Sequence, residues 1–132
     1  MQGCHTKNLF LKNKKNFFLL FSCEENSTVD LRRFSKSISA GNLSFAREEY
    51  LIKYLGVKPG SVSPYALLND INNRVEFYLE DRIYHSNSIN FHPLINTSTI
   101  TVQTKDFLNF MTENKKKINI FSLENYKIIK IL

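Results

Sequence analysis

The 132-residue chain has few of the residue patterns on which catalytic and metal sites usually depend. It has two cysteines and three histidines, with no Cys-x-x-Cys pair and no acidic or cysteine ligands suitably spaced around a histidine. Neither a disulfide framework nor a metal site is therefore expected. The chain has no Gly-x-Gly-x-x-Gly fingerprint, no P-loop and no ordered Ser-His-Asp set, so it shows none of the common signatures of nucleotide binding or nucleophilic hydrolysis.

Long apolar runs are also missing. No stretch approaches the roughly 18 consecutive apolar residues of a membrane-spanning helix, so no membrane association is expected. Residues 17–23 follow three lysines, as in a secretory signal, but this apolar run is shorter than a signal peptide requires. A buried β-strand explains it better, and the low cysteine content favours a reduced, cytoplasmic compartment.

The composition is that of a globular protein of one domain, residues 1–132. Apolar residues make up 42% of the chain, and the formal net charge is +6. A basic chain suits a polyanionic partner. Lysine, asparagine and isoleucine are abundant along the whole sequence, however, so the charge alone does not identify that partner.

The hydrophobic pattern predicts an α+β fold with a mixed sheet, because helical and strand patterns alternate irregularly. Strands are predicted at 8–12, 17–23, 43–45, 75–79, 89–91, 99–103 and 118–121. Helices are predicted at 30–37, 48–55, 64–68 and 105–113. Residues 13–16 read as a hairpin turn, Asp30 as a helix N-cap and Gly56 as a left-handed C-cap. The tail 122–132 is left unassigned.

Three separate stretches carry the most functional information: HTKNLFL at 5–11, GSVSP at 60–64 and FHPLINT at 91–97. In residue identity and in order along the chain, they resemble the YbaK/prolyl-tRNA-editing superfamily. LSFAREEYL at 43–51 and Asn69-Asp70 also fit that superfamily. Within it the resemblance is to the free-standing proteins related to the editing domain of bacterial prolyl-tRNA synthetase. The resemblance covers about residues 3–108.

The resemblance implies a set of site residues. Lys7 corresponds to the family's signature functional residue and is the predicted catalytic residue. Without the resemblance, a lysine just before a strand would be interpreted as a solvent-exposed residue flanking that strand. The Lys7 ammonium suits a phosphate or the oxygens of an acyl ester. Asn8, Gly60, Ser61 and His92 are the predicted substrate-binding residues. Because neighbouring side chains on a strand face opposite ways, Lys7 and Asn8 are expected to share a pocket only if the backbone is irregular there.

Both loop positions also have plain structural interpretations. Gly60-Ser61 fits an ordinary Pro-Gly turn before a helix, and a histidine beside a proline is often only packed and hydrogen-bonded. Asp70, at a predicted helix end, is interpreted as a cap or turn former rather than an acid.

The implied activity is hydrolysis of the ester between a wrong amino acid and the 3′ end of tRNA, with alanine on tRNA(Pro) the preferred pair. The resemblance implies no cofactor, no metal and no covalent nucleophile, with water attacking the ester. The expected partner is the alanine-carrying acceptor end of tRNA(Pro), and prolyl-tRNA synthetase is a further candidate. Deacylation of cysteinyl-tRNA is an alternative within the superfamily.

Two departures from the family pattern leave other readings open. Family members carry some tens of residues before the stretch that begins here at Gly3, and residues 113–117 replace a usual Gly-His-x-Pro segment. An inactive remnant, a non-catalytic tRNA-binding module and a generic basic RNA-binding protein are the alternatives. If the leading segment is missing, the apolar face of Phe10, Phe17, Leu19 and Phe21 is expected to be partly exposed. Poor solubility or a homodimer would then follow.

Overall fold

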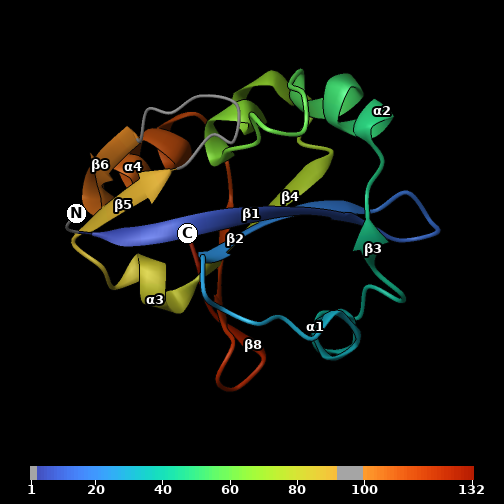
Figure 1. Cartoon of the computed structure of the whole chain (residues 1–132), viewed down its shortest axis with the longest axis horizontal. Coiled ribbons are helices and arrows are strands. Elements are labelled where there is room, and N and C mark those ends of the chain that lie inside the picture. Colours follow the sequence, from blue (N-terminus) through green and yellow to red (C-terminus); the bar gives the residue numbers. More distant parts are fainter. Residues whose placement is uncertain (1–2, 92–99) are drawn as a thin grey trace.

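The computed structural model describes residues 3–91 and 100–132, which form a mixed eight-stranded sheet with short helices on both faces (Figure 1). The strand order is β6-β5-β1-β2-β4-β7-β8, and β3 pairs with β1 outside this path. The strands are β1 (Cys4–Lys12), β2 (Phe18–Glu24), β3 (Ser44–Phe45), β4 (Val75–Glu80), β5 (Ser88–Phe91), β6 (Ile100–Gln103), β7 (Ile118–Ser122) and β8 (Lys127–Ile131). The predicted α+β class is confirmed.

The strands pair both parallel and antiparallel. The β1–β5, β2–β4 and β4–β7 pairs are parallel, whereas β1–β2, β1–β3, β5–β6 and β7–β8 are antiparallel. The β1–β2 hairpin turns as its sequence predicts. The side-chain oxygen of Asn13 accepts from the amides of Lys15 and Phe17, each at 2.9 Å, and Asn16 takes a positive φ of 60°.

The helices are α1 (Leu31–Ser37), α2 (Glu48–Tyr50), α3 (Asp81–Tyr84) and α4 (Thr104–Glu113), with a π turn η1 (Leu51–Leu55) and a 3₁₀ helix η2 (Pro64–Asn69). Asp30 caps α1 as predicted, since its carboxylate accepts from the amide of Arg33 at 3.1 Å. Gly56 ends η1 in the left-handed conformation, with φ 65°.

The predicted helix 48–55 is right in extent but wrong in type, because only its first turn is α-helical. Beyond it, Tyr50 and Tyr54 stack on each other and both pack against Phe18, with ring centroids 5.1 and 4.7 Å from it. This shared contact accompanies the wider π turn. The helix α3 was not predicted. Part of the unassigned tail is β8, which pairs antiparallel with β7.

Each face of the sheet has its own hydrophobic core. The first is covered by η1, η2 and α4 and includes Phe10 of β1; the second is covered by α1 and includes Leu11. In Figure 1 these helices lie above and below β1, respectively. Every residue of β2 except Glu24 is buried, which explains the apolar run in its sequence.

The expected exposure of the β1–β2 apolar residues is wrong. Phe10, Leu19 and Phe21 are buried, and Phe17 is half-buried against the second core. The two cores within this chain cover them, so they provide no basis for a homodimer. Over the described ranges, none of the helices has the length and apolarity needed to cross a membrane.

Candidate active site

A cavity of about 420 Å³ lies along one edge of β1. On this side β1 pairs with β5 only at Cys4 and His5, and with β3 only at Leu11 and Lys12. Among the described strands, none pairs with the segment between them on this side. We call the resulting cavity the groove. Its lining residues are Thr6, Lys7, Asn8, Phe10, Glu25, Phe45, Ala46, Leu51, Pro59, Gly60 and Val62.

The main-chain groups of Asn8 face the groove. The carbonyl of His5 accepts from Glu25 on the β2 side, and the amide of Asn13 donates to Phe17 on that same side. Main-chain direction alternates along an antiparallel pair, so the N–H and C=O of Asn8 point the other way. The carbonyl of Phe10 confirms this alternation, because it accepts from the amide of Ala46 at 2.9 Å.

Lys7 and Asn8 both line the groove although β1 is regular between them. The register with β2 runs without interruption from Thr6 to Lys12, so their side chains point to opposite faces of the sheet. The expectation that a shared pocket requires an irregular backbone is therefore wrong. A groove along a strand edge is open to side chains from both faces.

The ammonium of Lys7 is held by a main-chain oxygen. Its Nζ donates to the carbonyl of Ser27 at 2.6 Å. Ser27 lies in the short turn that follows β2. This turn is held by Glu80, a fully buried carboxylate at the end of β4. Oε1 of Glu80 accepts from the amide of Glu24 at 2.9 Å and from the hydroxyl of Ser27 at 2.8 Å.

Arg82 completes this network at the surface. Its Nε donates to Oε2 of Glu80 at 2.5 Å, and its Nη2 donates to the Ser27 hydroxyl at 2.5 Å. The hydrogen bond that Arg82 donates to Glu80, together with the negative charge of Glu80, raises the pKa of the Arg82 guanidinium. The buried carboxylate therefore has both a charge partner and two further donors, which is the condition for burying a charge without a large penalty.

Asn8 uses its side chain to hold the loop on the far wall of the groove. Its Nδ2 donates to the carbonyl of Val62 at 3.1 Å, and its Oδ1 accepts from the hydroxyl of Ser22. This contact ties the predicted substrate loop to β1 and brings Gly60 into the groove lining.

The other two predicted site residues, Ser61 and His92, are not among the described residues that line the groove. Ser61 follows Gly60 but is exposed and is not part of the lining; its amide donates to the carbonyl of Lys58 at 2.9 Å. His92 lies outside the described residues. In the ranges 3–91 and 100–132, no group of three or more histidine, cysteine, aspartate or glutamate side chains is arranged to hold a metal ion.

Phe45 is a lining residue that the sequence reasoning did not select. Its side chain is 63% exposed, which is unusual for a phenylalanine beside a cavity. Register places Phe45 opposite Leu11 of β1. In the sequence, the stretch 43–51 contributes only to the family resemblance. Residues 43–45 have a strand-like pattern, and such a pattern does not indicate that the ring of Phe45 remains exposed.

Comparison with known proteins identifies the family that this sequence matches. A family model described as "Aminoacyl-tRNA editing domain" matches residues 3–110. The chain is 32% identical over 126 residues to prolyl-tRNA synthetase associated domain-containing protein 1 of Danio rerio, covering 94% of this chain and 68% of that protein. It is 31% identical over 109 residues to the prolyl-tRNA editing protein ProX of Acetoanaerobium sticklandii, covering 82% and 66%.

A solved structure agrees in fold. It is described as a "putative trans-editing enzyme for prolyl tRNA synthetase", and it superposes with a TM-score of 0.64 at 16% identity, covering 88% of this chain and 68% of that one. This likeness shows that the two chains share a fold.

Proposed function

This chain belongs to the aminoacyl-tRNA editing family, and we propose that it hydrolyses the ester that joins a wrongly attached amino acid to the 3′ end of tRNA(Pro). Alanine is the proposed amino acid, and the cytoplasm the proposed location. The observation that carries the proposal is the groove, which brings the loop residue Gly60 to the strand edge that carries Lys7 and Asn8, although Gly60 is far from both in sequence.

Lys7 is proposed as the catalytic residue. An ammonium has three N–H donors, and the Ser27 carbonyl accepts from one of them. The other two donors stay available for a ligand, and the ammonium adds a positive charge to the groove lining. A fixed positive charge stabilises the oxyanion that develops when water attacks an ester, because it needs no reorganisation during the reaction.

The strand edge offers a second means of recognition. The main-chain N–H of Asn8 is a suitable donor for an ester oxygen, and its C=O is a suitable acceptor for the ammonium of the attached amino acid. Asn8 and Gly60 are accordingly proposed as substrate-binding residues, with Ser61 and His92 assigned to substrate binding only from the family resemblance. The apolar side chains of Phe10, Ala46 and Leu51 in the lining suit a small aliphatic side chain of the attached amino acid.

Water is the proposed nucleophile. The described lining contains one hydroxyl side chain, Thr6, and it donates to the carbonyl of Asn90 at 3.0 Å. This engagement makes Thr6 a poor nucleophile, since its proton is committed to an acceptor that cannot act as a base. Positioning and electrostatics therefore supply the rate enhancement. Prolyl-tRNA synthetase, named in the relatives, is the proposed protein partner.

The test is a substrate panel. Purified chain is mixed with Ala-tRNA(Pro), Cys-tRNA(Pro) and Pro-tRNA(Pro), and loss of the ester is followed by acid precipitation of the radiolabelled amino acid. We expect Ala-tRNA(Pro) to be hydrolysed fastest and Pro-tRNA(Pro) to resist. Preferential hydrolysis of Cys-tRNA(Pro) would instead assign the cysteine specificity. Binding of tRNA without hydrolysis of any substrate would identify a non-catalytic module and contradict the proposal.

A further inference from the structure

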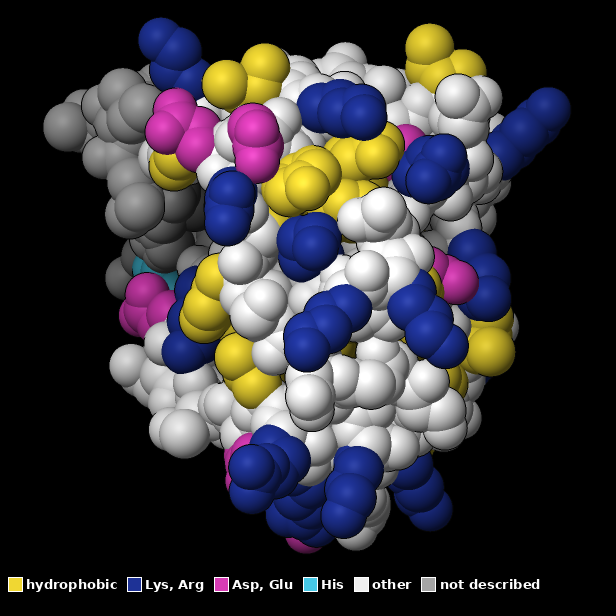
Figure 2. Space-filling model, turned by 90° about the vertical axis from the view of Figure 1, so that its right-hand side faces the viewer, with side chains coloured by type: hydrophobic (Ala, Val, Ile, Leu, Met, Phe, Trp, Pro, Cys, Tyr) yellow, Lys and Arg dark blue, Asp and Glu magenta, His cyan; other side chains and the backbone are white. Residues whose placement is uncertain are grey.

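One end of the molecule carries six cationic side chains, with the Asp30 carboxylate that caps α1 beside them. It consists of the β1–β2 hairpin tip, residues 12–17, and the helix α1, and we call it the cationic end. Its cations are Lys12, Lys14, Lys15, Arg32, Arg33 and Lys36. All but Lys12 are exposed. Figure 2 views the molecule from this side and shows lysine and arginine side chains spread over the face, with sparse aspartate and glutamate.

The two parts of the cationic end form one surface. Nδ2 of Asn13, in the hairpin tip, donates to the carbonyl of Ala40, just after α1, at 2.7 Å. The side chains of Asn13, Lys14 and Lys15 line a shallow cavity together with residues 39–42. The hairpin and the helix therefore present their cations in a fixed relation to each other.

None of these cations forms an ion pair with a carboxylate of the described residues. The ion pairs found in the described ranges join Arg47 to Glu49, Arg82 to Glu80 and Lys117 to Glu76, and none involves the cationic end. Arg33 lies over the ring of Tyr126 at 4.2 Å, an aromatic contact that leaves its charge uncompensated. A cluster of unpaired like charges destabilises a fold slightly, and a polyanion bound across it would remove that repulsion.

The cationic end adjoins the groove through β3. Ser44 pairs with Lys12 and Phe45 pairs with Leu11, so the exposed ring of Phe45 lies between the cations and the groove that it lines. A ligand that reaches the groove past Phe45 therefore passes directly over this surface. An exposed aromatic ring beside a cationic track is the arrangement used for single-stranded nucleic acid, where bases stack and phosphates meet lysine and arginine.

We propose that the cationic end binds the sugar-phosphate backbone of the tRNA acceptor stem, while the ring of Phe45 stacks on a base of the single-stranded 3′ end entering the groove. This inference rests on the proposed function, because it takes the groove as the place where the aminoacyl ester is bound. An acidic protein or an anionic membrane would use the charge but would leave Phe45 and the groove without a role.

The electrostatic part is tested with Lys14→Ala/Lys15→Ala. The matched control is Lys105→Ala/Lys130→Ala, which removes the same charge from α4 and β8. Binding of uncharged tRNA(Pro) is measured by fluorescence anisotropy over a range of salt concentrations. Each lost phosphate contact lowers the slope of log affinity against log salt by about 1. We expect the hairpin variant to lower the slope by about 2 and the control to leave it unchanged.

The stacking part is tested with Phe45→Ala and Phe45→Trp. Loss of one stacked base weakens binding by about 5- to 150-fold, with the salt slope unchanged, and tryptophan should restore affinity. The loss should disappear with a tRNA whose single-stranded 3′ end has been removed. An equal loss with intact and truncated tRNA would overturn the stacking assignment.

Two results would overturn the docking surface itself. One is an equal drop in salt slope for the control variant, which would assign the attraction to net charge. The other is retention of full tRNA affinity by Lys14→Ala/Lys15→Ala together with loss of binding to phosphatidylserine vesicles, which would assign the face to a membrane. Because uncharged tRNA is used, the result is independent of hydrolysis: a chain that docks as proposed but deacylates nothing supports the surface and contradicts only the enzyme.

Discussion

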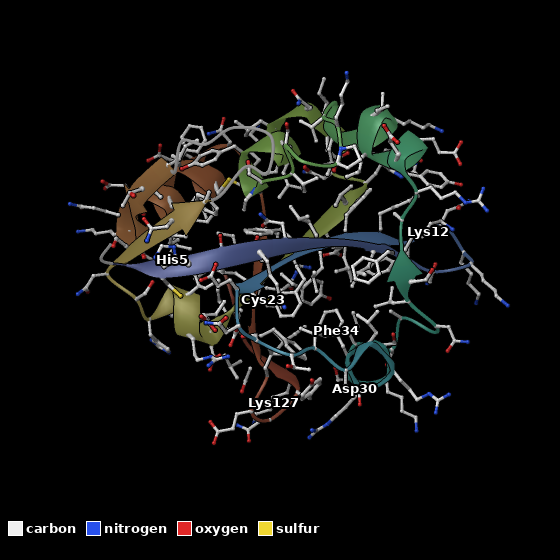
Figure 3. All side chains as sticks on the ribbon, in the orientation of Figure 1. His5, Lys12, Cys23, Asp30, Phe34 and Lys127 are labelled. Atoms are coloured by element: carbon white, nitrogen blue, oxygen red, sulfur yellow. The ribbon has the colours of Figure 1, made fainter. Side chains whose placement is uncertain are left out.

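The Lys7 ammonium and the main-chain carbonyl of Ser27 are joined by a hydrogen bond of 2.6 Å. This bond directs the proposed catalytic cation, and the buried Glu80 holds the turn that supplies the carbonyl. Figure 3 labels His5 near the start of β1 and Cys23 near the end of β2, the strand that leads into this turn. The position of Lys7 therefore depends on a residue more than seventy positions away in sequence.

Glu80→Gln should slow deacylation by about 10- to 100-fold, because misplacing a catalytic group by about 1 Å has effects of this size. The change removes the negative charge that pairs with Arg82 and weakens the hold on Ser27. Single-turnover rates at a saturating enzyme concentration measure the effect. Glu76→Gln, a matched change on the same strand, should leave the rate unchanged.

A double-mutant cycle separates positioning from general stability. If Glu80 acts through Lys7, Glu80→Gln should add no further loss in the Lys7→Ala background. Additive losses in the cycle would show that Glu80 affects the rate by another route.

Asp70→Ala should lower the free energy of unfolding by about 1–3 kcal/mol, since it leaves two main-chain amides, one of them buried, without an acceptor. The buried Asp70 carboxylate accepts from the amides of Arg74 at 3.0 Å and Val75 at 2.8 Å. This turn-forming contact is what the sequence interpretation expected of Asp70. Urea unfolding followed by circular dichroism measures the change, and the exposed Glu124→Ala should stay within about 0.5 kcal/mol of the parent.

Stability should fall at alkaline pH. Burial raises the pKa of the Cys23 thiol to about 12, and burial with the nearby Glu76 raises the pKa of Tyr78 to about 12. Both groups are neutral when protonated, and the folded state favours that form. Their contribution is therefore complete below the unfolded values of about 9 and 10 and is lost as the pH rises toward 12.

Thermal melts from pH 8 to 11 test this alkaline loss. We expect the melting temperature to fall with rising pH, and to fall less steeply in Cys23→Ala when each variant is compared with its own value at pH 8. Parallel curves for the parent and Cys23→Ala would contradict the assignment of Cys23.

Local signals in the sequence predicted most of the fold. Asn16 at positive φ and the Asp30 cap depend on neighbouring residues alone, and both were predictable. The π turn was not, because it accompanies the packing of Tyr50 and Tyr54 on Phe18, a residue more than thirty positions earlier. The strand β8 was missed because all its residues are exposed at the sheet edge, so burial imposes no alternating pattern.

The groove residues likewise divide into those that the sequence identifies and those that only the three-dimensional arrangement reveals. The family resemblance selected Lys7, Asn8 and Gly60, which the structure brings together. It did not select Phe45 or Glu80, because their importance lies in long-range arrangement. Phe45 matters because β3 pairs with β1 so briefly, and Glu80 because a turn far along the chain folds over it. Neither relation leaves a local pattern in the sequence.

The most direct test of the central claim is the deacylation rate of Lys7→Ala. With enzyme in excess over Ala-tRNA(Pro) and at a saturating concentration, loss of one fixed electrostatic contact should slow hydrolysis by about 100- to 1000-fold. Lys105→Ala, which removes the same charge from α4, should keep the parent rate. Circular dichroism should show Lys7→Ala folded, since the Lys7 side chain contributes to neither core. A folded Lys7→Ala that hydrolyses Ala-tRNA(Pro) as fast as the parent would contradict the assignment of Lys7 and of the groove.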